Sequence, residues 1–308
     1  MVRNLIYILI IGILFSALTP TFAQEFPVGD EDIYRGVGNY QNILKNARYK
    51  DIDKSFAKDS IIKLTILGTF KSKNQNFKPK AYITKRQTLL YIGRILGLDE
   101  EEYMDELRKL NVLTNEEYEI ITKNDKKPGN TTREEVALWI GRSIKLEEKL
   151  PNITRGFRDY TYFSTKYLKI IESFIQQGYM NGYQDGYFKP KHYITKEELA
   201  KVLDNALDDI LLMRDFKIKE GEIDHIKRVV TTEGDIPVIK TLYYMKNKDN
   251  TYPIIYTSKS RRLNLTKGFP VYNNGRLQTS DILDIKDTIK YYVDYENNVI
   301  CGEIKTIY

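Results

Sequence analysis

The sequence predicts an α+β protein with two folded regions, a helix-rich array of repeats at residues 40–213 and a small all-β domain at 220–308. Residues 77–85 read FKPKAYITK, and residues 188–196 read FKPKHYITK. A shared string of this length indicates an internal repeat, and a repeat array is built from copies of one structural unit. In the C-terminal region, runs of β-branched and aromatic residues separated by Asn- and Gly-containing turns predict short strands instead.

Residues 1–23 predict a secretory signal. The single charge of this stretch, Arg3, precedes an apolar run from Leu5 to Leu18, and small residues lead to Ala23. The alternative is a membrane anchor, but the run is short for the roughly 20 apolar residues that span a bilayer. We therefore expect a secreted protein with no membrane span after cleavage. Residues 24–39 contain three glycines and several acids, which predicts a linker.

The composition excludes some classes of protein. The chain has 48 Lys and Arg against 42 Asp and Glu, a formal net charge of +6. This excess is mild for 308 residues, so we expect no nucleic-acid partner. A partner that carries carboxylates or phosphates would suit the charge better. A single cysteine, Cys301, rules out an internal disulfide, so packed cores must supply the stability.

Two helices of the repeat region are predicted to end at a glycine. Apolar residues recur at steps of three and four over residues 59–67 and again over 167–175. Gly68 and Gly178 follow these runs and are typical C-cap residues. After Gly178, Asn-Gly and Asp-Gly pairs indicate a turn before the second FKP string.

Three further helices are predicted to begin with a capping box, in which a threonine and a residue three positions later cap each other. The boxes are Thr84–Gln87, Thr132–Glu135 and Thr195–Glu198. The first two boxes are 48 positions apart. The similar sequences Tyr91–Arg94 and Trp139–Arg142 are also 48 positions apart. The sequence therefore predicts three repeats, with the middle one degenerate. We place them at about residues 49–98, 99–150 and 157–212.

The order helix, glycine turn, Phe-x-Pro, Ile-Thr-basic and helix resembles the S-layer homology domain. The third repeat matches best, because Phe157–Asp159, Gly178–Pro190 and Ile194–Glu198 look like the family's Phe-x-Asp, glycine–aspartate turn and Ile-Thr-Arg-Ala-Glu motifs. The first repeat keeps Asp51 and residues 77–85 but lacks the glycine–aspartate turn. The middle repeat keeps little beyond its capping box and its helix.

This resemblance implies a pseudo-threefold helical bundle that docks on the cell wall or S-layer without catalysis. Its grooves would hold an anionic, often pyruvylated, secondary cell-wall polysaccharide, and we expect the best groove beside Lys196 in the third repeat. The residues carried over as anion partners are Lys85, Arg133 and Lys196. Those that would orient sugar hydroxyls or the basic group are Asp51 and Asp159. Those that would shape the groove wall of the third repeat are Gly182, Tyr183, Asp185 and Gly186.

The position of the three cations supports a binding role independently of the family. Lys85, Arg133 and Lys196 each follow the capping threonine. A cation in the first helical turn opposes the helix dipole by about 0.3–1 kcal/mol, and free backbone amides at that position favour anions. Three cations at three such positions favour binding, whereas any one of them alone would be read as a solvated surface residue.

The C-terminal region predicts six or so short strands. Their number in fewer than 90 residues indicates a small barrel, OB-like or SH3-like, and the region resembles small β-modules that often follow S-layer homology repeats. The expected strands lie near residues 223–230, 238–244, 252–256, 269–272, 288–293 and 299–304.

No catalytic motif stands out in the sequence. We expect His192 to lie on the surface, His225 to lie on the first strand of the β-domain, and Cys301 to be a buried or incidental thiol. We therefore expect no enzyme activity, no cofactor and no metal site. Two alternatives remain open: a structural surface protein whose bundle binds other proteins, and a wall-active enzyme with an unrecognised site in the C-terminal domain.

Overall fold

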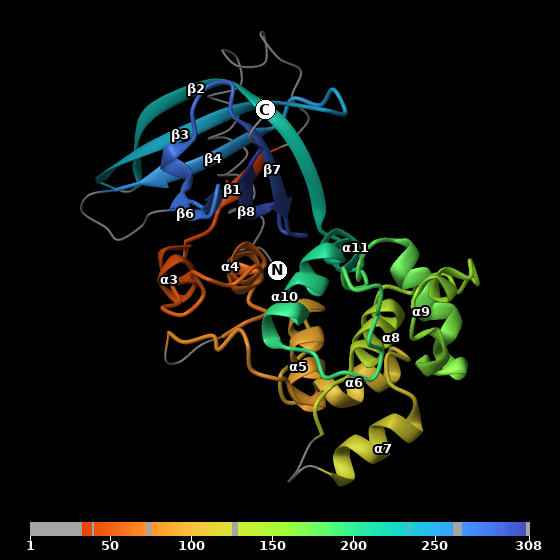
Figure 1. Cartoon of the computed structure of the whole chain (residues 1–308). Helices are drawn as coiled ribbons and strands as arrows, with labels where there is room; N and C mark the ends of the chain where they lie inside the picture. The colour runs from red at the N-terminus through yellow and green to blue at the C-terminus, as the bar shows by residue number, and fades with distance from the viewer. Residues whose placement is uncertain are drawn as a thin grey trace, which may run out of the picture. The chain divides into compact units, whose positions relative to one another are not determined.

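A computed structural model describes residues 33–38, 40–71, 75–124, 129–233, 235–260 and 267–305 (Figure 1). The chain forms two compact units. Among the described residues, those within 40–218 and 270–278 form the helical unit, and those within 33–38, 219–269 and 279–305 form the β-unit. The signal predicted at residues 1–23 lies outside the described residues. The chain is therefore of mixed α and β structure, as the sequence predicts.

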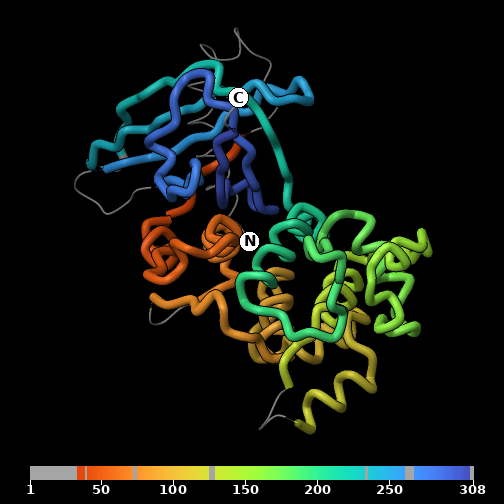
Figure 2. Tube along the Cα trace, viewed as in Figure 1, coloured from red at the N-terminus to blue at the C-terminus, as the bar shows by residue number. Residues whose placement is uncertain are grey.

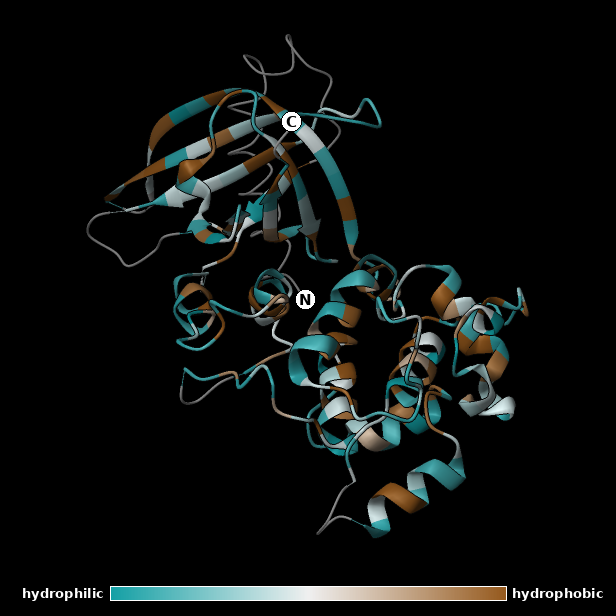
Figure 3. Cartoon of the chain, in the orientation of Figure 1, coloured by the Kyte–Doolittle hydropathy of each residue, from teal (hydrophilic) through white to brown (hydrophobic). Residues whose placement is uncertain are grey.

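The helical unit is built from short amphipathic helices. In Figure 3, hydrophilic and hydrophobic segments alternate along these helices, so each has an apolar face to bury. The glycines that follow α4 and α9, Gly68 and Gly178, have φ of +78° and +76°, which confirms their predicted capping role. The α-helices are α3 (Tyr40–Asn46), α4 (Lys58–Ile66), α5 (Lys85–Ile95), α6 (Tyr103–Lys109), α7 (Asn115–Lys123), α8 (Arg133–Ser143), α9 (Leu168–Gln176), α10 (Lys196–Asn205) and α11 (Leu207–Leu212).

The three predicted capping boxes are confirmed at the starts of α5, α8 and α10. In each, the threonine side chain accepts from the backbone of the third helical residue, whose side chain accepts from the threonine backbone. A similar box at Thr114 and Glu117, which was not predicted, begins α7. These caps fix where each helix begins, and therefore where the residue after the threonine lies.

The segments that lead into these three helices, residues 82–84, 130–132 and 193–195, meet one another; we call them the axial segments. Their backbones form a closed cycle of hydrogen bonds, in which one N–H of each segment donates to the next. The bonds run from Ile83 N to Ile194 O at 3.2 Å, from Ile194 N to Thr131 O at 2.9 Å and from Thr131 N to Ile83 O at 2.9 Å. The side chains of all three residues are fully buried. This cycle relates the three segments to one another in a threefold manner.

The β-unit contains strands from both ends of the chain. Its strands are β1 (Ile33–Gly36), β2 (Lys217–Glu233), β3 (Ile236–Asn247), β4 (Ile254–Lys259), β7 (Thr288–Val293) and β8 (Asn298–Ile304). They are hydrogen-bonded in the order β1-β4-β3-β2-β7-β8, and β1 also pairs with β8. The β2–β3, β3–β4 and β7–β8 pairs are antiparallel, whereas β1 is parallel to both of its neighbours.

The predicted linker at residues 24–39 is wrong for its last part, because Ile33–Gly36 forms β1. The red strand lies among the teal and blue strands in Figure 2. Tyr34 is 1% exposed, and its ring centroid lies 6.0 Å from that of Tyr291 in the β-unit core. The run Ile33-Tyr34 is too short to stand out as a strand among the glycines and charges around it. Its partner strands, β4 and β8, begin at Ile254 and Asn298, far later in the chain.

Residues 270–278 group with the helical unit and contain β5 (Pro270–Asn273) and most of β6 (Arg276–Thr279). The two strands flank Asn274-Gly275, both at positive φ, as a tight hairpin requires. Strand β6 was not predicted. Within the described residues, no helix has both the length and the apolar character needed to cross a membrane.

Candidate functional site

Two aspartates of the predicted repeats hold the loops that contain the FKP strings. Asp159 accepts backbone N–H groups through both carboxylate oxygens, from Phe188 at 2.9 Å and from Lys189 at 2.7 Å. Asp51 makes the same pair of bonds to residues 77–78 at 2.8 and 2.7 Å. Lys189 has a φ of +60°, a strained conformation for a non-glycine residue that the bidentate carboxylate stabilises. The two aspartates therefore shape the loops.

The glycine–aspartate turn of the third repeat needs its glycines for different reasons. Gly186 has a φ of +81°, which favours glycine. Gly182 has no room for a side chain, because a Cβ there would lie 2.3 Å from Cε1 of Phe157. Hydrogen bonds from Tyr183 N to Tyr187 O at 2.8 Å and from Gly186 N to Tyr183 O at 3.0 Å close the turn. These contacts fix the position of the Tyr183 ring.

Arg133, the first residue of α8, lies against this turn. Its guanidinium donates from Nε to the Phe188 carbonyl at 2.9 Å and from Nη2 to the Asn181 carbonyl at 2.8 Å. It also lies over the Tyr183 ring, 4.6 Å from the ring centroid. The side chain is buried, and this burial lowers the pKa of Arg133. The glycine–aspartate turn of the third repeat therefore contacts the cation of the middle repeat and not Lys196 of its own repeat.

The hydroxyl of Tyr183 connects this cluster to α10. It donates to Oε1 of Glu198 at 2.7 Å. Burial raises the pKa of Tyr183 to about 12, although the Arg133 charge opposes this shift. Burial acts to raise the pKa of Glu198 too, but hydrogen bonds from Thr195 and Tyr183 outweigh it and lower that pKa. At neutral pH the cluster therefore contains a guanidinium, a neutral phenol and a carboxylate.

Lys196 repeats the arrangement of Arg133 at the next junction. Its Nζ donates to the Phe77 carbonyl at 2.9 Å and lies 4.6 Å from the centroid of the Phe77 ring. Burial lowers the pKa of Lys196, while the charge of Asp51 opposes this effect. The cations of the middle and third repeats thus each contact the FKP loop of the next repeat in the cycle, and the charge of Asp51 in the first repeat acts on Lys196.

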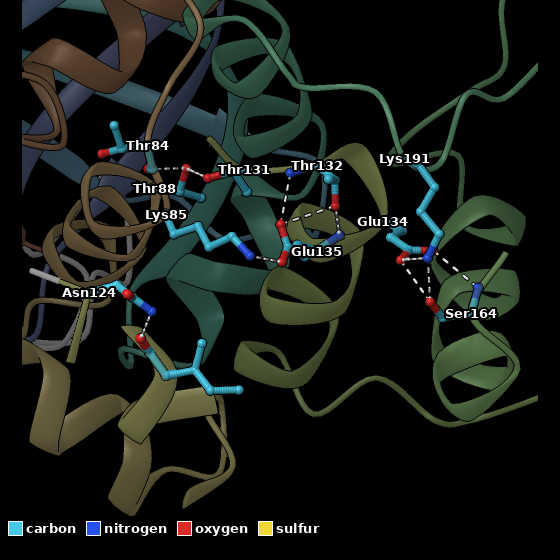
Figure 4. A network of polar contacts seen from close by, with 11 residues as sticks. Thr84, Lys85, Thr88, Asn124, Thr131, Thr132, Glu134, Glu135, Ser164 and Lys191 are labelled. Atoms are coloured by element: carbon cyan, nitrogen blue, oxygen red, sulfur yellow. Dashed lines mark hydrogen bonds and ion pairs between the residues drawn. The ribbon is translucent and has the colours of Figure 1, made fainter. Parts of the chain in front are cut away.

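Lys85 lies at the junction of the first and middle repeats (Figure 4). Its Nζ contacts Oε1 of Glu135 at 2.5 Å. Glu135 is the capping glutamate of α8 and accepts from the Thr132 backbone at 2.8 Å. The ammonium therefore joins the first turn of α5 to that of α8. The structure does not bring the three predicted cations together, since each occupies its own junction.

The third repeat carries an open pocket of about 460 Å³. Lys189 Nζ lies 2.9 Å from Oδ2 of Asp185. Lys191 Nζ is ion-paired with Glu134 of α8 and donates to Oγ of Ser164 at 2.6 Å (Figure 4). The residues that line the pocket are Asp159, Tyr162, Asp185, Tyr187, Lys189, Pro190, Lys191 and His192.

This pocket offers hydrogen-bonding groups of both kinds. The ammonium of Lys189 lowers the pKa of Asp185, which keeps an acceptor at the rim. An ammonium has three donors, and Lys191 uses two of them on Glu134 and Ser164. Tyr162 adds an aromatic ring that is 66% exposed. Such a set can bind a polar, ring-shaped molecule that carries hydroxyls and a negative group.

The sequence-based site contained only two of these pocket residues, Asp159 and Asp185. Lys189 and Lys191 belong to the FKPK string that occurs in both the first and third repeats. This repetition was the one feature of the sequence that could have indicated a functional role for them. The surface position expected for His192 is confirmed.

The other residues considered for chemistry do not form a site. His225 lies on β2, as expected, and stacks on Tyr244 with 4.1 Å between ring centroids. Cys301 is buried in β8. In the part of the chain that the structure describes, no group of three or more His, Cys, Asp or Glu residues could hold a metal ion.

Comparison with known families supports the first and third of the predicted repeats. The sequence model of the S-layer homology domain matches residues 48–89 and 157–200. These segments contain both loop-holding aspartates, both FKP strings and the pocket. A search of curated proteins found no match. Domains of this family generally anchor proteins to cell-wall polysaccharide, which implies association with the cell surface or S-layer.

Proposed function

Because this chain is an S-layer homology domain protein, we propose that it anchors noncovalently to an anionic secondary cell-wall polysaccharide and catalyses no reaction. The general role of the family supports the wall polysaccharide as partner. The pocket of the third repeat is the observation that carries the proposal, because it is open and lined by cations, carboxylates and aromatic rings. Export follows from the signal predicted at residues 1–23.

Lys191 in the pocket is better placed for an anion than Arg133 at the family's basic position. Arg133 is 4% exposed, and two of its nitrogens donate to backbone carbonyls. The side chain of Lys191 is 49% exposed and keeps one donor beyond its two internal partners. A carboxylate substituent of the polysaccharide, such as a pyruvyl group, would bind at Lys191 and His192. Sugar hydroxyls would then bind at Asp185 and Lys189.

Two structural features of the proposal go beyond the family match. We assign residues 99–150 as a degenerate middle repeat, since residues 130–132 take the same place in the cycle of backbone hydrogen bonds as their two counterparts. The β-unit would be the displayed domain. The pairing of β1 with both β4 and β8 supports a small barrel of the OB or SH3 kind for it.

Sedimentation with purified cell-wall sacculi tests the proposal. The chain should pellet with intact sacculi and remain in solution with sacculi stripped of their secondary polysaccharide. A Lys189→Ala, Lys191→Ala double variant should lose most of the bound fraction. Lys201→Ala, which removes an exposed lysine on α10, should bind as the unaltered chain does. Equal binding to intact and stripped sacculi would reject the polysaccharide as partner, and release of soluble wall fragments would reject the non-enzymatic role.

A further inference from the structure

Two tyrosines project from the axial segments of the first and third repeats. Tyr82 is 60% exposed and Tyr193 is 51% exposed. Each precedes a fully buried isoleucine, Ile83 or Ile194. Because side chains alternate in extended backbone, burying the isoleucine turns the tyrosine outward. The isoleucines therefore fill the core at these positions, and both tyrosine rings are left on the surface.

The two rings contact each other. Their centroids lie 6.0 Å apart at an interplanar angle of 70°, an edge-to-face arrangement. A single exposed tyrosine is ordinary on a protein surface. Here the same position of two repeats carries a tyrosine, and the cycle of hydrogen bonds through Ile83 and Ile194 brings the two side by side. The result is an aromatic surface at the centre of the three axial segments.

Along the chain, this aromatic surface adjoins the pocket of the third repeat. Tyr193 directly follows Lys191 and His192, which line that pocket. On the side of the first repeat, Lys80 is ion-paired with the buried Glu197 and its side chain remains 74% exposed. The equivalent pair in the third repeat is Lys191 with Glu134. A lysine therefore stands two residues before each tyrosine, Lys80 before Tyr82 and Lys191 before Tyr193.

We propose that Tyr82 and Tyr193 form a second subsite that stacks on a sugar ring of the same polysaccharide chain whose neighbouring unit occupies the pocket. This inference rests on the proposed function and extends it from one sugar to a run of several. The C–H face of a pyranose ring is weakly positive and complements the negative face of a phenol ring. Two tyrosine rings alone are too small for a stable protein interface, which buries about 800 Å² per partner.

Calorimetric titration of the full chain against two probes tests this subsite. The probes are purified secondary wall polysaccharide and its single repeating unit, obtained by hydrolysis. A Tyr82→Ala, Tyr193→Ala double variant should bind the polysaccharide about tenfold more weakly, equivalent to about 1.4 kcal/mol. It should bind the single unit as the unaltered chain does. Tyr82→Phe with Tyr193→Phe should retain the affinity, because the rings remain.

Tyr295→Ala, which removes a tyrosine that is 76% exposed on the β-unit, is the matched control and should change neither affinity. Wild-type affinity of the alanine double variant for the polysaccharide would overturn the subsite and leave the pocket intact. Equal loss with both probes would also overturn it, since the tyrosines would then act through the pocket. If the unaltered chain bound neither probe, the proposed function would fail and the subsite with it.

Discussion

Nε of Arg133 donates to the carbonyl oxygen of Phe188, 55 positions later in the chain, at 2.9 Å. Lys196 makes the equivalent bond to Phe77 at the other preserved junction. The family resemblance assigns both of these basic residues to ligand binding. In the structure, each of them holds the FKP loop of the next repeat in the cycle. The lysines beside that loop, Lys189 and Lys191, are left to face the open pocket.

Replacing Arg133 should destabilise the helical unit. Arg133→Ala leaves the carbonyls of Phe188 and Asn181 without their donors in a buried place, at a cost of about 3 kcal/mol. Arg133→Lys should recover only part of this loss, because an ammonium cannot reproduce the planar fork of a guanidinium. Urea unfolding followed by circular dichroism measures both. Arg155→Ala, which removes an exposed arginine, is the control, and its free energy of unfolding should lie within about 0.5 kcal/mol of that of the unaltered chain. An equally small change for Arg133→Ala would refute the loop-holding role.

The two loop-holding aspartates should be sensitive to loss of charge. Asp159→Asn keeps one acceptor but places an N–H donor against a backbone N–H of residues 188–189, which should cost about 2 kcal/mol. Asp51→Asn should have a similar effect on the first repeat, because it makes the same two bonds. Thermal unfolding monitored by circular dichroism is a suitable measurement. An unchanged melting temperature in both variants would show that these bonds do not hold the loops.

Two glycine substitutions should differ sharply. In Gly182→Ala the new Cβ would lie 2.3 Å from a ring carbon of Phe157, so the ring must move, and we expect a loss of about 1–3 kcal/mol. Gly156→Ala is the matched control, because a Cβ there meets no atom within 4 Å. The difference between their free energies of unfolding measures how tightly the glycine–aspartate turn contacts Phe157. Equal values would contradict that contact.

Tyr183 should ionise at a higher pH than an ordinary tyrosine. Burial raises its pKa from 10.0 to about 12. A tyrosine with a higher pKa in the folded state adds stability that is fully present below pH 10 and is lost as the pH rises toward 12. The difference in tyrosinate absorbance between the unaltered chain and Tyr183→Phe should therefore appear above pH 10, the pKa of an ordinary tyrosine. A difference centred at the ordinary tyrosine pKa would show that the phenol is solvated and not enclosed by Arg133 and Glu198.

Much of the helical unit could be predicted because its signals are local. The capping boxes at Thr84, Thr132 and Thr195 each need only four residues, and all three form as predicted. The C-cap glycines Gly68 and Gly178 are equally local. Strand β1 could not be predicted, because its stability comes from pairing with strands that lie more than 200 residues later.

The candidate site was harder to predict, because its contacts cross between repeats. Sequence comparison aligned Lys196 with Arg133 correctly, but it could not show that each contacts the loop of the following repeat. The cation beside the glycine–aspartate turn is therefore Arg133 and not Lys196. Lys191 was visible in the repeated string, but its place in the pocket depends on Glu134 of another repeat.

Wall binding through the third repeat can be located by titrating the isotopically labelled chain with a purified fragment of secondary wall polysaccharide and recording amide nuclear magnetic resonance. The largest shifts should occur at residues 185–193, around Asp185, Lys189, Lys191 and His192. Lys189→Ala with Lys191→Ala should abolish them. Shifts confined to the β-unit, or none at saturating fragment, would contradict the claim that this chain anchors to the wall through the pocket of its third repeat.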